Sequence, residues 1–197
     1  MEKPYIAAAD RNKEAIFEIL KPFLLKSQRV LELGSGTGQH AVHFSEKMQH
    51  LQWQPTDLET NICGIRQWVA QSETSNILEP FALDVSSHDW RPNTHDFVFT
   101  SNTTHFMPWG EVVSMFTGVS LSLCSLGHFS VYGPFHYEGE PISDGNKKLD
   151  DWLREQSEDF QIRYVSAIVG IARGSEFRLI DDVLMPSNNH LLIFQRQ

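Results

Sequence analysis

The chain has 197 residues, of which 41% are hydrophobic and 21% charged, a composition that fits one soluble globular domain with a sizeable core. The formal net charge of −9 argues against a surface that neutralises phosphates, so we expect no nucleic-acid partner. No apolar run approaches the roughly 18 residues of a membrane span, and the start Met1-Glu2-Lys3-Pro4 is not a signal peptide. The two cysteines, Cys63 and Cys124, lack metal-ligand spacing. We therefore expect a cytoplasmic protein with reduced thiols, without a membrane association and without a metal site.

The hydrophobic pattern alternates between helical stretches and short apolar runs along the whole chain. A helix is predicted at 10–25, with Asp10 as its N-cap and with Pro22 kinking or ending it. The elements predicted after it, in chain order, are a strand at 29–33, a helix at 37–48, a strand at 51–55, a helix at 58–71, strands at 77–83 and 95–101, a helix at 109–125, a strand at 127–133, helices at 144–156 and 165–172, and strands at 177–185 and 190–195.

This alternation predicts an α/β fold, with a mostly parallel sheet and helices on both of its faces. The last two strands are joined only by the turn residues Pro186-Ser187-Asn188-Asn189, which are too few for a crossover, so these strands must pair antiparallel. Five parallel strands followed by an antiparallel hairpin resemble the seven-stranded, Rossmann-like class I methyltransferase fold. We expect a single domain over 1–197, with an N-terminal helical cap at 1–26 and a lid loop at 135–149.

The most informative segment runs from Val30 to His40 and reads V-L-E-L-G-S-G-T-G-Q-H. A short strand enters three glycines at alternate positions and continues into an amphipathic stretch, which predicts a strand–turn–helix that holds a nucleotide-like cofactor. Gln39 stands where a dinucleotide fingerprint needs its third glycine, and the G-K-[ST] ending of a Walker loop is absent. Glu32 would repel a pyrophosphate but suits a cationic aminoacyl group. The segment resembles motif I of the class I S-adenosylmethionine (SAM) methyltransferases; the alternative is a glycine turn without a ligand.

Polar residues follow three predicted strands at their carboxyl ends, where doubly wound sheets bind ligands. Asp57, about 20 residues after the glycines, is a candidate ribose ligand, or a cap of the next helix. Asp84 could accept the adenine amine while the Val85 N–H serves a ring nitrogen, or Asp84 could only initiate a turn. The fourth strand runs into polar residues from Asn102 onward. The candidate cofactor-binding residues are Glu32, Gly34, Ser35, Gly36, Gly38, Asp57, Leu58, Asp84, Val85 and Asn102.

A closer resemblance rests on segments spread over almost the whole chain. They are Arg11-Asn12-Lys13, the glycine turn with Ala41-Val42-His43-Phe44, Trp53-Gln54-Pro55-Thr56-Asp57, Ala82-Leu83-Asp84-Val85, His105 with Pro108-Trp109, Tyr132-Gly133-Pro134, and Met185-Pro186-Ser187-Asn188-Asn189. On these segments the chain resembles the small methyltransferases of the domain of unknown function 938 (DUF938) family, which includes methyltransferase-like protein 26. The family's usual Asn-Met-Ile-His is Asn102-Thr103-Thr104-His105 here, which makes this pocket wall more polar. The resemblance implies SAM as cofactor and S-adenosylhomocysteine (SAH) as product, without a defined acceptor.

His105, just past the fourth strand, is the candidate catalytic base, because a histidine titrates near neutrality; the alternative is that it orders its own loop. Arg11, Asn12 and Lys13 could place a helix over the cofactor and offer donors to an anionic substrate, or could form a solvated first turn. The family resemblance favours the first of these. The remaining candidate substrate-binding residues are Trp109, Tyr132 and Asn188.

Together these features favour a SAM-dependent methyltransferase that acts on a small-molecule acceptor. The alternative is a non-catalytic SAM-binding or scaffold protein that keeps the fold, because binding does not prove transfer. An NAD-dependent oxidoreductase is disfavoured by Gln39 and by the terminal hairpin.

Overall fold

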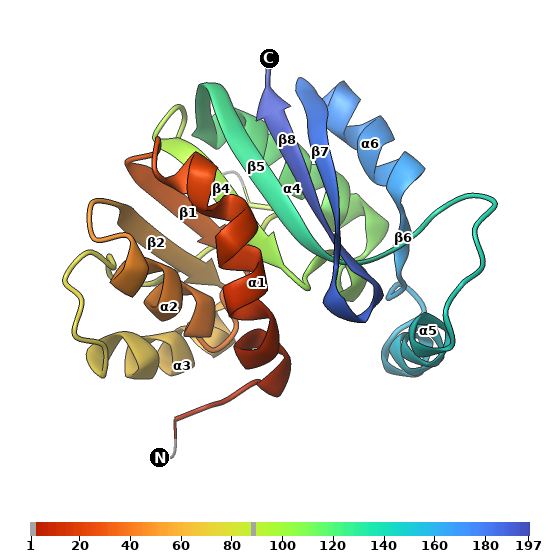
Figure 1. Ribbon diagram of the computed structural model, residues 1–197, viewed down its shortest axis with the longest axis horizontal. Helices are drawn as coiled ribbons and strands as arrows, with labels where there is room; N and C mark the ends of the chain where they lie inside the picture. The colour runs from red at the N-terminus through yellow and green to blue at the C-terminus, as the bar shows by residue number, and fades with distance from the viewer. Residues whose placement is uncertain (1–2, 88–89) are drawn as a thin grey trace.

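The computed structural model describes residues 3–87 and 90–197 as an open, twisted sheet between two layers of helices (Figure 1). The first two residues of the expected N-terminal cap lie outside the described residues. The strands are β1 (Arg29–Leu33), β2 (Gln52–Asp57), β3 (Phe81–Ala82), β4 (His95–Ser101), β5 (Leu123–His136), β6 (Arg163–Tyr164), β7 (Phe177–Met185) and β8 (Asn189–Arg196). Their order is β3-β2-β1-β4-β5-β8-β7, and β6 pairs with the end of β5.

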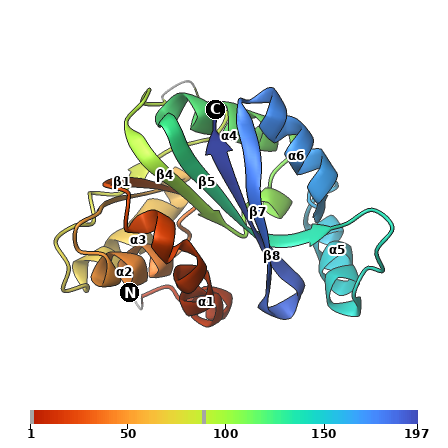
Figure 2. The same cartoon turned by 45° about the horizontal axis from the view of Figure 1, so that its top comes forward.

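Strands β1 to β5 pair in parallel, whereas β8 runs antiparallel to both of its neighbours, β5 and β7. The predicted mostly parallel sheet with a C-terminal antiparallel hairpin is therefore confirmed. The helices are α1 (Ala7–Leu24), α2 (Gln39–Lys47), α3 (Glu59–Ala70), α4 (Trp109–Ser122), α5 (Asp144–Gln156) and α6 (Val165–Gly174), with short 3-10 turns η1 (Thr104–Phe106) and η2 (Pro186–Asn188). Helices α1, α2 and α3 lie on one side of the sheet and α4 and α6 on the other, while α5 stands near the end of β5 (Figures 1 and 2).

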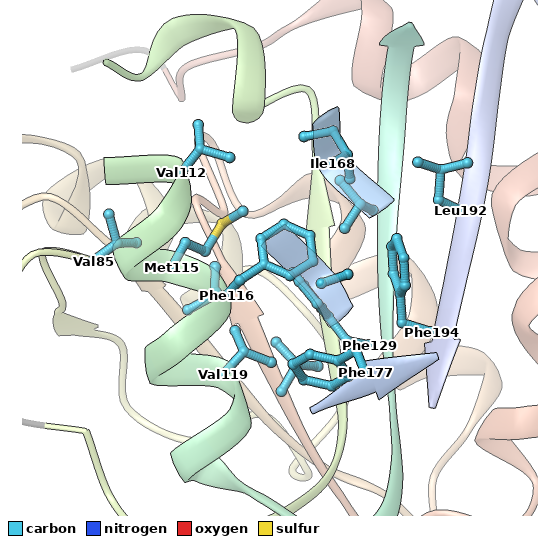
Figure 3. Close-up of a cluster of buried hydrophobic side chains, with 14 of the residues drawn as sticks. Val85, Val112, Met115, Phe116, Val119, Phe129, Ile168, Phe177, Leu192 and Phe194 are labelled. Carbon is cyan, nitrogen blue, oxygen red and sulfur yellow. The ribbon is translucent and has the colours of Figure 1, made fainter. Parts of the chain in front are cut away.

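Each face of the sheet carries its own hydrophobic core. In β4, Phe97 and Phe99 belong to the core under α1 and α2, whereas Val98 belongs to the core under α4 and α6. Successive strand residues point to opposite faces, so a strand that is covered on both sides reads as a continuous apolar run. In the second core, Phe116 of α4 packs edge-on against Phe129 of β5, with ring centroids 5.1 Å apart (Figure 3).

Helix α1 begins earlier than its sequence pattern predicts. Its N-cap is Ile6, which makes no side-chain capping bond, and Asp10 lies within the first turn, where it pairs with Lys13. The prediction of Asp10 as N-cap is wrong, because a tertiary contact fixes where the helix begins. In this contact the Ile6 N–H donates to the side chain of Gln39. Pro22 lies inside the helix, which ends at Leu24.

Among the other differences from the expected boundaries, which include the longer β5 and the unpredicted β6, two have a clear physical cause. The strand expected at 77–83 is reduced to β3, Phe81–Ala82, with Ile77 making an isolated bridge to β2. Pro80 lies between them and cannot donate to a strand ladder, so the pairing is interrupted there. The helix expected at 109–125 ends at Ser122, because Leu123 already pairs with β4 as the first residue of β5.

Candidate functional site

A cavity of about 1130 Å³ lies at the carboxyl ends of β1, β2, β4 and β5, the edge at which open α/β sheets bind ligands. Residues of α1 line one side of it, and residues of α5 and η2 line another. Cavities that hold one small ligand typically measure about 300–1,000 Å³. The volume is therefore sufficient for a cofactor together with a second small molecule.

The turn after β1 brings bare backbone to the cavity. Gly34 has φ +64°, and a Cβ there would collide with Cγ2 of Thr103, so the turn packs directly against the loop after β4. Gly36 has φ +58°, and a Cβ there would meet only Ile6, at 3.7 Å. Gly38 does not line the cavity and packs against α3. The first two glycines thus shape the cavity, and the third brings two helices together.

Asp57, the last residue of β2, is fixed by hydrogen bonds to both carboxylate oxygens. The Gly36 N–H donates to Oδ2 at 2.6 Å, while the Leu58 N–H and the Asn61 amide donate to Oδ1 at 2.7 and 2.8 Å. The N-cap of α3 is Leu58 and not Asp57. Since the carboxylate also lines the cavity, it is a rigid acceptor with lone pairs left for hydroxyl donors.

Asp84, past the end of β3, initiates a turn and also lines the cavity. Its Oδ1 accepts the Ser86 N–H at 2.8 Å and the Ser86 hydroxyl at 2.6 Å, and these bonds lower the pKa of the carboxyl. Val85 follows with its side chain buried in the second core and likewise lines the cavity. Both interpretations of Asp84, as a turn residue and as a pocket residue, are compatible with this geometry.

Glu32 lies behind the cavity wall and does not line it. The carboxyl is 1% exposed and accepts a hydrogen bond from the Trp53 indole at 2.8 Å. Burial raises its pKa to about 7, which the bonds from Trp53 and Ser35 only partly offset. Glu32 therefore has no direct access to a ligand in this structure, whereas Ser35, which is bonded to it, lines the cavity.

A polar network joins four elements across the cavity wall. Oδ1 of Asn12 in α1 lies 2.7 Å from Nε2 of His40 in α2, and the Tyr132 hydroxyl of β5 is hydrogen-bonded to Asn12 and to Asn189 of β8. Burial lowers the pKa of His40 to about 3, so its ring is neutral at physiological pH. The network of Asn12, His40, Tyr132 and Asn189 holds α1 in a fixed position over the sheet edge.

Gln39 has a role that its position in the motif did not indicate. Its Oε1 accepts the Ile6 N–H at 2.7 Å and the Thr37 hydroxyl at 2.8 Å. The residue that replaces a third fingerprint glycine therefore ties the chain before α1 to the glycine turn. Ile6 itself lines the cavity.

His105 lies in η1, is 3% exposed and lines the cavity. Its Nδ1 has no hydrogen-bond partner among the described residues. Burial, and then the nearby charge of Arg163, lower its pKa to about 4, so the expectation of titration near neutrality is wrong. The imidazole is instead neutral at pH 7, a state in which it can accept a proton.

Arg163 of β6 holds the segment that contains His105. Its guanidinium donates to the carbonyls of Thr104, Met107 and Asp159. The same guanidinium lies 5.6 Å from the ring centroid of Trp109. Trp109 therefore lies beside Arg163, is partly exposed to solvent and does not line the cavity.

A further part of the wall comes from α5, η2 and the start of β8, through Gly145, Asn146, Leu149, Pro186, Ser187 and Asn189. Helix α5 is held by a buried pair, in which Nε2 of His136 lies 2.7 Å from Oδ2 of Asp150, while Oδ1 accepts the Ile162 N–H. Within the expected lid segment 135–149, residues 135–136 belong to β5 and residues 144–149 to α5. The part of this segment that lines the cavity beyond β5 is therefore helical.

A sequence model described as "Protein of unknown function (DUF938)" matches residues 3–196. The chain belongs to the DUF938 family. This confirms the resemblance inferred from the sequence segments.

Solved structures show what the DUF938 protein is similar to in fold. An O-methyltransferase family protein from Burkholderia thailandensis matches 96% of the chain with a TM-score of 0.79 at 14% identity, over 60% of its own length. Human N-acetylserotonin methyltransferase in complex with SAM matches 96% with a TM-score of 0.80 at 13% identity, over 52% of its length. The PH0226 protein from Pyrococcus horikoshii matches 93% with a TM-score of 0.69 at 17% identity, over 91% of its length. The DUF938 protein thus has the class I methyltransferase fold and spans little more than half of the first two structures.

The structure brings most of the predicted site residues of the DUF938 protein into one cavity. Those that line it are Arg11, Asn12, Gly34, Ser35, Gly36, Asp57, Leu58, Asp84, Val85, Asn102, His105 and Tyr132. Those that do not are Lys13, Glu32, Gly38, Trp109 and Asn188.

Several lining residues were not predicted from the sequence, including His40, Asn61, Asn146 and Leu149. Asn146 is 8% exposed although it lies in a strongly charged helix, and a buried amide in such a helix was the available signal. Within residues 3–87 and 90–197, no helix is long and apolar enough to cross a lipid bilayer. The same residues contain no group of three or more His, Cys, Asp or Glu side chains arranged to hold a metal ion.

Proposed function

We propose that the DUF938 protein is a SAM-dependent methyltransferase that transfers a methyl group to a small-molecule acceptor. The observation that supports this most strongly is the cavity itself. The bare turn at Gly36 and the fixed carboxylate of Asp57 lie side by side in it, with Asp84 and Val85 at the neighbouring strand end.

The residues present fit SAM. Asp57 offers a rigid carboxylate to the ribose hydroxyls, as carboxylates do at this position of doubly wound sheets. Asp84 and the Val85 N–H offer an acceptor and a donor to the adenine edge. The turn at Gly36, where a Cβ would meet only Ile6 at 3.7 Å, leaves room for the sulfur and for the aminoacyl tail attached to it. Human N-acetylserotonin methyltransferase, which shares the fold, was crystallised with SAM, in line with this assignment.

Bound SAM supplies an electrophilic methyl group for an in-line displacement, in which holding the nucleophile in position contributes most of the rate. Arg163 fixes η1 and so fixes His105 at the cavity wall. The neutral imidazole of His105 can accept a proton from an acceptor that must lose one. Because its pKa lies near 4, the His105 ring is unprotonated at physiological pH but is a weak base there, so it suits an acceptor that loses its proton only as the methyl group is transferred.

Calorimetric titration with SAM and SAH, with NADH as the control ligand, tests the cofactor. Micromolar binding of both adenosyl compounds, about −8 kcal/mol, is expected, with no binding of NADH. Gly36→Val should abolish SAH binding while the far-UV circular dichroism stays that of a folded protein, since the side chain would enter the cavity. Binding of NADH alone would contradict the proposal.

Release of SAH from SAM in the presence of a metabolite library tests the transfer step. His105→Gln should leave SAH affinity within about twofold and lower turnover by about 10²–10⁴-fold if the acceptor loses its proton to His105. SAH binding without turnover on any acceptor would favour the non-catalytic SAM-binding alternative. Equal turnover of the variant and the wild type would assign His105 to the loop structure alone.

A further inference from the structure

Charge is unevenly distributed around the cavity. Three carboxylates line it, Asp57, Asp84 and Glu111, and they come from the ends of β2 and β3 and from the start of α4. The charge of Asp84 contributes to raising the pKa of Glu111, which places these two groups close together. Among the described residues that line the cavity, the one lysine or arginine is Arg11 of α1. An anionic group that enters the cavity is therefore attracted toward α1 and repelled from the adenosine side.

The face of α1 toward the cavity has a simple composition. Ala8, Arg11, Asn12 and Ala15 all line the cavity, and their i, i+3, i+4, i+7 spacing places them on one side of the helix. The alanines let the helix backbone lie close to a ligand. Arg11 and Asn12 are the long polar side chains of this face.

These two polar residues differ in how much of their bonding capacity is used. Asn12 is bonded to His40 at 2.7 Å and to Tyr132, which fixes the helix on the sheet edge. Arg11 has no hydrogen bond or ion pair to any described residue and is exposed. Lys13, two residues further along, is paired with Asp10 and does not line the cavity. A fixed helix thus presents one free guanidinium to the cavity.

We propose that Arg11 binds the carboxylate of the aminoacyl tail of SAM and SAH, an inference that rests on the proposed function. If Asp57 holds the ribose, the tail continues past the turn at Gly36, over which the start of α1 lies. The carboxylate of the tail then meets the one cation of the described lining, and a guanidinium can bind it with two parallel hydrogen bonds. Arg11 could instead bind the carboxylate of an anionic acceptor. The two ligands chosen for the experiment distinguish these cases, because neither of them is an acceptor and only SAH carries the tail.

Calorimetry on the full chain, with SAH and with 5′-methylthioadenosine, tests the proposal. The second ligand keeps the adenosine and the sulfur but lacks the amino-acid tail. Arg11→Gln should weaken SAH binding by at least tenfold and leave 5′-methylthioadenosine within twofold. Because the substitution also removes a cation that would repel the tail's ammonium group, a loss of SAH affinity identifies the carboxylate as the partner.

Lys13→Gln is the matched control, since it removes one cation from the same helix without altering the cavity lining, and SAH affinity should stay within twofold. Arg11→Lys should lose part of the affinity, because it keeps the charge and loses the two-bond geometry. Circular dichroism and the melting temperature of each variant report on folding.

Equal weakening of both ligands by Arg11→Gln would overturn the proposal, because it would indicate a distorted cavity. Unchanged binding of both ligands would overturn it as well, and would leave Arg11 facing the acceptor. If the wild type binds neither ligand, the proposed function fails together with this inference. If the wild type binds SAH and the Arg11 variants do so equally well, only this inference fails.

Discussion

The substitution Glu32→Gln should make the protein more stable at alkaline pH and not at acidic pH. Glu32 is fully buried beside Trp53, and its pKa is raised from 4.5 to about 7. A group whose pKa is raised by folding stabilises the fold fully below its unfolded pKa, and this stabilisation is lost as the pH rises through the folded pKa. The wild type therefore loses free energy of unfolding from pH 4.5 to above pH 7, on the order of 3 kcal/mol for a shift of this size.

Glutamine has nearly the shape of glutamate and carries no charge at any pH. Its carboxamide oxygen can still accept the indole N–H of Trp53, which lies 2.8 Å from the carboxylate in the wild type. Its amide N–H can donate to the hydroxyl of Ser35, which bonds Glu32 in the wild type. The packing is thus kept while the buried charge is removed, so the difference between the variant and the wild type reports on ionisation.

Urea unfolding at about pH 5 and about pH 8, followed by circular dichroism, gives the free energy of unfolding of each protein by linear extrapolation. The free energy of unfolding of Glu32→Gln, minus that of the wild type, should be larger at the higher pH than at the lower pH by on the order of 2–3 kcal/mol. Glu18→Gln, on the exposed side of α1, is the control and should stay within about 0.5 kcal/mol at both values. A difference between Glu32→Gln and the wild type that does not change with pH would refute the reasoning.

Gly118→Ala should destabilise the protein by about 1–3 kcal/mol, since the new Cβ would collide with the Trp90 ring. Gly170→Ala should instead raise the melting temperature, because Gly170 lies inside α6 and a Cβ there would meet open space. The reverse order of melting temperatures would contradict the packing assigned to these two glycines. In the Glu32→Gln background, the free energy of unfolding should fall as the pH drops from about 6.5 to about 4.5. Burial depresses the pKa of His40 to about 3 and that of His105 to about 4, so the unfolded chain binds these protons more readily than the folded one. Urea unfolding at both values tests this, and equal stabilities would count against buried, neutral histidines at these positions.

Much of the architecture could be predicted because the sequence pattern reflects burial directly. The run Phe97-Val98-Phe99 is apolar at every position since both faces of β4 are covered, and the short link at 186–189 forces the antiparallel hairpin. The start of α1 could not be predicted, because Gln39, far along the chain, fixes it. The interruption of β3 could have been predicted from Pro80, but the hydrophobic pattern alone does not show it.

The candidate site divides in the same way. Asp57 and Asp84 could be found because parallel strands end at one edge, so residues at or just past each strand end are placed by topology. Asn146 and Leu149 could not, since α5 is held at the cavity by tertiary contacts such as the buried pair of His136 and Asp150. The low pKa of His105 could not be predicted either, because the burial of its side chain depends on the packing of the whole fold.

The network of Asn12, His40, Tyr132 and Asn189 has a consequence for folding. Its hydrogen bonds join the first helix to a strand near the end of the chain, so this wall forms only after long loops have closed. A ligand of the cavity then binds only the completely folded protein. At a ligand concentration of about 100 times its Kd, binding adds about 2.7 kcal/mol to the free energy of unfolding of the whole chain. Amide exchange should consequently slow in α1 and in the β7–β8 hairpin together when the cavity is filled.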